Sequence, residues 1–69
     1  MFTFKRQYKD YLLKGRMIKY VANKLDIQPQ YLGDIISGRK HPSKRLVKQI
    51  LALISPDAKV NEYFIIKEK

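Results

Sequence analysis

Apolar residues recur at helical spacing along four stretches of this chain of 69 residues. Residues three or four positions apart share one face of a helix, so the pattern predicts four helices, each with one buried face. They cover about residues 3–14, 17–26, 28–37 and 43–54. The positions expected to face inward are Phe4, Tyr8, Tyr11 and Leu12; Val21, Ala22 and Leu25; Leu32, Ile35 and Ile36; and Leu46, Val47, Ile50, Leu53 and Ile54.

Capping residues mark the ends of these predicted helices. Thr3 and Ser43 stand where an N-cap hydroxyl can accept a hydrogen bond from the first helical turn. Pro29 occupies a first helical position, where its missing N–H costs nothing. Gly15 and Gly38 follow helices one and three, where the left-handed backbone of a C-terminal cap favours glycine. We therefore expect a tight turn between the second and third helices.

The last part of the chain permits two interpretations. Ser55-Pro56-Asp57 resembles a helix start, and a fifth helix would place Val60, Tyr63 and Phe64 on one face. The run from Tyr63 to Ile66 also has strand propensity, and such a strand can pair across a dimer. The predicted fold is all-α with four to five helices, and the C-terminal segment is left as helix or strand.

Charge and length limit the classes of protein to which the chain can belong. One domain over residues 1–69 is expected, and without cysteine it has no disulfide framework. The formal net charge is +9, and the whole excess falls within residues 1–50. Such a field attracts polyanions, of which DNA is the most densely charged. The longest apolar run, residues 50–54, is too short for a membrane span, so we expect a cytoplasmic protein that does not bind membranes.

Residues 15–43, GRMIKYVANKLDIQPQYLGDIISGRKHPS, carry a recognisable pattern. Its shared elements are Val21-Ala22, Lys24-Leu25, Ile27, Tyr31-Leu32, Ile35, Gly38-Arg39-Lys40 and Pro42-Ser43. The segment resembles the helix-turn-helix of the Cro and phage-repressor family, also called XRE-like. The resemblance extends over residues 3 to about 55. It implies a lambda-repressor-like domain with a helix-turn-helix at about 17–37 and a C-terminal extension at 56–69.

The resemblance also implies a function and its residues. The protein would be a small Cro-type transcriptional regulator of a phage genetic switch, acting as a homodimer on double-stranded DNA. Its recognition helix, about residues 28–37, would lie in the major groove. The implied base contacts are Gln28, Gln30, Gly33 and Asp34. The implied phosphate contacts are Arg16, Lys19, Tyr31, Arg39, Lys40, Ser43 and Lys44.

Several positions depart from the family pattern. Met17 and Ile18 replace a polar pair, Pro29 replaces a polar reader, and Asp34 stands where a basic residue is frequent. With Ile36, they favour a second hypothesis in which an apolar patch binds a protein. In that case the chain would be a phage modulator that binds another regulator, such as a repressor's DNA-binding domain. The residues predicted for a protein interface are Met17, Ile18, Ile36, Tyr63 and Phe64.

The sequence shows no arrangement of residues that is typical of a catalytic site. The one histidine, His41, lies in a basic loop, and the six acidic residues are scattered along the chain. No glycine-rich phosphate loop is present. We expect no enzyme activity, no metal site and no cofactor.

Overall fold

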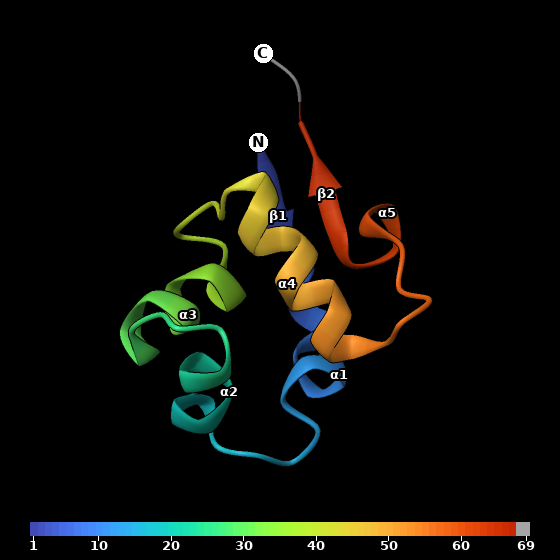
Figure 1. The fold of residues 1–69 in the computed structure, drawn as a ribbon. Helices are drawn as coiled ribbons and strands as arrows, with labels where there is room; N and C mark the ends of the chain where they lie inside the picture. Colours follow the sequence, from blue (N-terminus) through green and yellow to red (C-terminus); the bar gives the residue numbers. More distant parts are fainter. Residues whose placement is uncertain (68–69) are drawn as a thin grey trace.

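The computed structural model describes residues 1–67, which fold around a single apolar core (Figure 1). Within these residues the fold is mainly helical, with a two-stranded sheet that joins segments from near the two ends of the chain. The elements are β1 (Phe2–Phe4), the 3-10 helix η1 (Arg6–Tyr8), α1 (Lys9–Leu13), α2 (Ile18–Lys24), α3 (Pro29–Ser37), α4 (Lys44–Ile54), α5 (Val60–Tyr63) and β2 (Phe64–Ile66). The prediction of a helical domain is confirmed, but the small sheet shows that the domain is not all-α.

The predicted apolar faces of α2, α3 and α4 form most of the core. Val21, Ala22, Leu32, Ile35 and Ile50 have no exposed side-chain surface. The ends of these helices also agree with the sequence. Pro29 is the first residue of α3, and Gly38 ends it with a φ of 88°. Ser43 caps α4, because its Oγ accepts a hydrogen bond from the backbone N–H of Leu46 at 3.2 Å.

The prediction for the N-terminus is wrong. Thr3 lies in β1 and caps no helix, and α1 begins only at Lys9. Phe4 is buried, as expected, but it reaches the core from a strand, whereas Tyr11 is 55% exposed. Aromatic residues favour a half-buried strand when a partner strand is present. That partner lies about sixty positions away in sequence, so local periodicity does not reveal it.

The C-terminal segment contains both of the predicted alternatives. Residues 60–63 form α5, and residues 64–66 form β2 directly after it. The strand pairs with β1 of the same chain, antiparallel, with Phe4 opposite Phe64 and Phe2 opposite Ile66. Figure 1 shows the two strands side by side, with the N-terminus close to them. The segment 56–66 is therefore an integral part of the fold, not an extension of it.

The helix start predicted at Ser55-Pro56-Asp57 is displaced along the chain. The Ser55 Oγ accepts a hydrogen bond from the Asp57 N–H at 3.2 Å, but this forms a local turn. The helix begins at Val60, after Lys59 as N-cap. The prediction that Ser55 caps the fifth helix is therefore wrong, because Ser55 ends α4 and its hydroxyl closes a local turn.

Aromatic rings join the N-terminal and C-terminal segments. The Phe4 and Phe64 rings meet edge to face at 5.3 Å between centroids, and the Tyr8 and Tyr63 rings do so at 5.0 Å. Such pairs stabilise a fold beyond the area that they bury. Desolvation raises the pKa of the Tyr63 hydroxyl above its usual 10.0, with a further contribution from the negative charge of Glu62. The sheet and this cluster therefore fix the position of η1 and α1.

Candidate nucleic-acid interface

The turn between α2 and α3 fixes the relative position of these two helices. Asp26 adopts a left-handed backbone with a φ of 58°, and Gln28 is extended before Pro29 opens α3. The backbone N–H of Ile27 donates to the Ala22 carbonyl oxygen at 3.0 Å, which ties the turn back to α2. Ala22 is fully buried, and its small side chain permits a close approach of the helices. The turn and the packing of α2 against α3 therefore fix the position of the exposed side of α3.

Three of the four predicted base-contact residues lie on the outward side of α3. Leu32, Ile35 and Ile36 bury the inward side, and helical spacing places Gln30, Gly33 and Asp34 away from them. Gln30 is exposed, whereas Gly33 and Asp34 are partly buried. The fourth residue, Gln28, is exposed at the N-cap, and its side chain makes no cap hydrogen bond. Both glutamine amides are thus accessible at the start of the helix.

Asp34 differs from the other base-contact candidates because it already has partners. Its Oδ1 accepts a hydrogen bond from the Arg39 Nε at 3.2 Å, and the two side chains form an ion pair. Its carbonyl oxygen accepts from the backbone N–H groups of Arg39 and Lys40, at 2.9 and 3.1 Å, and from the Ser37 hydroxyl at 3.1 Å. Asp34 therefore holds the basic loop against the end of α3.

The loop of residues 39–43 carries exposed cations on an anchored backbone. Arg39 and Lys40 are exposed, whereas Pro42 is buried. His41 Nδ1 lies 3.2 Å from the Phe2 carbonyl oxygen and 3.3 Å from the Thr3 Oγ1, which connects the loop to β1. Sequence reasoning missed this anchoring role, because β1 was expected to be helical.

The remaining predicted phosphate contacts differ in availability. Lys19 and Lys44 are exposed, whereas Tyr31 packs partly against the core. The Ser43 hydroxyl caps α4. Arg16 is largely committed elsewhere, since its Nε donates to the Leu13 carbonyl oxygen at 3.0 Å. Its Nη2 also donates to the Leu12 carbonyl oxygen at 3.3 Å. The main role of Arg16 is therefore to satisfy carbonyl groups at the C-terminal end of α1.

The predicted protein interface is not continuous in this structure. Met17 is 75% exposed, but Ile36 and Phe64 are 6% and 1% exposed and belong to the core. Ile18 is partly buried, and Tyr63 packs in the aromatic cluster. This corrects the expected patch, because the inward side of α3 is wide enough to include Ile36.

Two further cations border α3, and the sequence analysis did not connect them with it. Arg6 and Lys9 line a hollow of about 400 Å³ together with Ile18, Gly33 and Ser37. They come from η1 and α1, which the sheet and the aromatic cluster hold in place. Arg6 and Lys9 are three residues apart in the sequence, but their position beside α3 depends on the tertiary fold.

The described residues form neither a metal-binding cluster nor a membrane-spanning helix. Residues 1–67 contain no group of three or more His, Cys, Asp or Glu side chains arranged to hold a metal ion. None of the helices formed by these residues has the length and apolar character needed to cross a membrane.

Comparison with protein families, with curated proteins and with solved structures finds no match for this chain.

Proposed function

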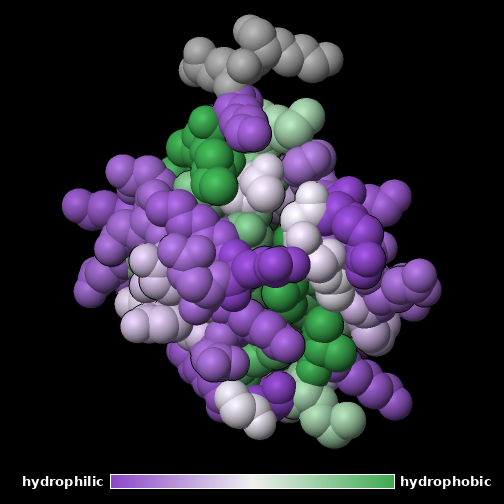
Figure 2. Space-filling model, turned by 180° about the vertical axis from the view of Figure 1, so that it is seen from behind, coloured by the Kyte–Doolittle hydropathy of each residue, from purple (hydrophilic) through white to green (hydrophobic). Residues whose placement is uncertain are grey.

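We propose that this protein is a sequence-specific DNA-binding transcriptional regulator of the Cro and phage-repressor type. In this proposal α2 and α3 form the helix-turn-helix of a lambda-repressor-like domain, and α3 enters the major groove. One observation carries it: the outward side of α3 is free of the core and polar, and exposed cations lie on both sides of it. Figure 2 shows that hydrophilic side chains also cover most of the face opposite the view of Figure 1.

Base recognition is assigned to the first turns of α3. A glutamine amide can donate and accept at the edge of adenine, so exposed Gln30 and Gln28 are suited to direct readout. Gly33 lies on the same side and has no side chain, which permits a close approach of the helix to the base edges. The carboxylate of Asp34 is assigned to the loop, because it is paired with Arg39.

Phosphate binding is assigned to the cations around α3. Exposed Lys40 and Lys44 follow its C-terminal end, Lys19 lies on α2, and Arg6 and Lys9 border its flank. Phosphate contacts fix the orientation of a protein on the duplex, whereas base contacts determine the sequence that is read. Two copies bound to half-sites about one helical turn apart complete the proposal.

The second hypothesis from the sequence has less support. A modulator that binds another regulator through Met17, Ile18 and Ile36 requires a continuous apolar patch. Ile36 is buried, and Ile18 packs partly against the core, which leaves Met17 as the one strongly exposed member of this set. DNA binding through α3 requires no such rearrangement.

Selection from a library of randomised duplex DNA tests the proposed function. The purified protein is expected to enrich a common motif, and the selected duplex should bind more tightly than its scrambled version. Typical DNA-binding regulators prefer their sites by at least about 10³-fold over non-specific DNA. If no motif is enriched over repeated rounds, the protein does not recognise DNA by sequence and the proposal fails.

A further inference from the structure

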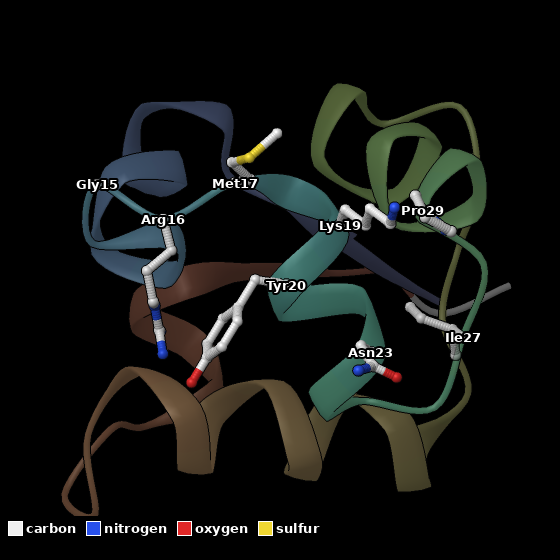
Figure 3. Close-up of a pocket in the computed structure, with 8 residues that line it drawn as sticks. All are labelled: Gly15, Arg16, Met17, Lys19, Tyr20, Asn23, Ile27 and Pro29. Carbon is white, nitrogen blue, oxygen red and sulfur yellow. The ribbon is translucent and has the colours of Figure 1, made fainter.

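A second surface lies on the outward side of α2, separate from the predicted reading face of α3. It is a hollow of about 770 Å³ that extends from the end of α1 to the start of α3 (Figure 3). Its lining residues are Gly15, Arg16, Met17, Lys19, Tyr20, Asn23, Ile27 and Pro29. The DNA-binding proposal uses Lys19 from this set and leaves the others without a role.

The hollow exposes large apolar and aromatic side chains that the core does not cover. Met17 is 75% exposed, and Tyr20 is 48% exposed on the next turn of chain. Figure 3 shows that Met17, the N-cap of α2, and Tyr20 on α2 project in different directions, with Ile27 and Pro29 at the other end of the hollow. Methionine and tyrosine are enriched at protein interfaces, where they supply adaptable apolar contact.

Cations surround this apolar surface. The Arg16 guanidinium lies 5.2 Å from the centre of the Tyr20 ring, and the Lys24 ammonium lies 5.5 Å from it. Figure 3 shows the Lys19 side chain extending toward Pro29. Among the lining residues that the structure describes, none is acidic. An apolar partner that carries carboxylates would therefore find complementary charge at the edges of the hollow.

We propose that this hollow binds an acidic amphipathic helix of another protein. Apolar side chains of the partner would cover Met17 and Tyr20, and Asp or Glu side chains at its edges would pair with Lys19 and Lys24. A helix packed in a groove is a recurring mode of peptide recognition. A protein is favoured over nucleic acid because interfaces with DNA are more polar, whereas Met17, Ile27 and Pro29 in this lining have side chains that cannot hydrogen-bond to phosphates or bases.

A peptide-display selection supplies the test. Random peptides of about twelve residues, enough for roughly three helical turns, are selected on the immobilised full-length chain. Enriched peptides are expected to be acidic and to carry aliphatic or aromatic residues at helical spacing. Their synthetic versions are then titrated by fluorescence anisotropy, and Tyr20→Ala and Lys24→Glu are each expected to weaken binding roughly tenfold or more.

Matched variants separate the hollow from general surface properties. Tyr11→Ala removes another exposed tyrosine, and Lys48→Glu reverses another exposed lysine, both outside the hollow. Both are expected to leave peptide binding unchanged. The proposal is overturned if no peptide is enriched, or if the enriched peptides are not acidic or bind all four variants equally.

The same variants also test two other possible occupants of the hollow, duplex DNA and a second copy of this chain. If Tyr20→Ala weakens binding to duplex DNA as strongly as it weakens peptide binding, the hollow belongs to a DNA interface. If it lowers the self-association of the protein in sedimentation equilibrium, the occupant is a second copy of the chain. Either result overturns the proposal of an acidic protein partner.

Discussion

Individual side chains on α3 have distinct roles in this account. Gln30 is exposed and makes none of the side-chain hydrogen bonds found within residues 1–67, whereas Asp34 is held by Arg39. A free amide can bond to a base without first losing a partner. A paired carboxylate must break an existing contact before it can bind anything else. The two residues should therefore respond differently to substitution.

The first prediction concerns Gln30. Gln30→Ala should relax the base preference at one position of the selected duplex and cost about 1–3 kcal/mol of binding free energy there. Binding to duplexes changed one base pair at a time gives the measurement. Gln49→Ala, an exposed glutamine on α4, is the control and should leave the preference unchanged. An equal loss on every sequence would mean that Gln30 does not read a base.

The second prediction concerns the charge of Asp34. Asp34→Asn keeps an oxygen that can accept from Arg39 but removes a negative charge close to the proposed DNA surface. Affinity for every duplex should rise by roughly 0.5–1 kcal/mol, because that charge no longer opposes the phosphates. The stability of the fold should change by less than about 1 kcal/mol, because the Arg39 side chain is 75% exposed and the asparagine oxygen can still accept its hydrogen bond. Loss of a preference for cytosine at one position would instead assign Asp34 to base recognition.

Among the elements, β2 determines how the two ends of the chain pack. Phe64 is 1% exposed, and its ring contacts Phe4 of β1. Phe64→Ala should lower the free energy of unfolding by about 3–5 kcal/mol, a large part of the stability of a small domain. Ile65→Ala is the neighbouring control at a 44% exposed position and should cost much less. Urea unfolding followed by circular dichroism measures both, and equal losses would contradict the role given to Phe64.

Glycine substitutions in and after α3 test its geometry. A Cβ added at Gly33 would lie 3.6 Å from the Ile18 Cδ1, an ordinary contact. Gly33→Ala should therefore stabilise the fold by about 0.5–1 kcal/mol, because alanine favours a helix, while DNA binding weakens through the added methyl group. Gly38→Ala should destabilise the fold by about 1 kcal/mol, since its φ is 88°. Thermal unfolding measures whether each substitution raises or lowers the stability of the fold. If Gly33→Ala leaves DNA binding unchanged, Gly33 does not belong to the surface that contacts the bases.

Elements defined by local signals were predictable from the sequence, and those defined by distant partners were not. Ser43, Pro29 and Gly38 mark the ends of α3 and α4 through interactions within a few residues, so their roles could be recognised. The strand at Phe2–Phe4 depends on Phe64–Ile66, and only the fold brings these segments together. Ile36 was likewise predicted both as an inward position and as part of a protein interface, and only the packed core shows that it is buried.

At the scale of the whole molecule, the candidate site was predictable in part. The family resemblance implied Gln28 and Gln30 as base contacts, and the structure leaves both side chains exposed, Gln28 as the N-cap of α3 and Gln30 in its first turn. The pairing of Asp34 with Arg39 and the position of Arg6 and Lys9 beside α3 depend on tertiary contacts. The net charge of +9 describes the whole chain, but its effect depends on these positions.

A salt titration of DNA binding tests the central claim most directly. Affinity for the selected duplex and for its scrambled version would be measured by fluorescence anisotropy over a range of salt concentrations. The five cations assigned to phosphates, which are Arg6, Lys9, Lys19, Lys40 and Lys44, predict a slope of about −4.5 per bound copy in log affinity against log salt. The slope should be the same on both duplexes, with the selected duplex bound more tightly throughout. A shallow slope, with equal affinity for the two duplexes, would contradict the account.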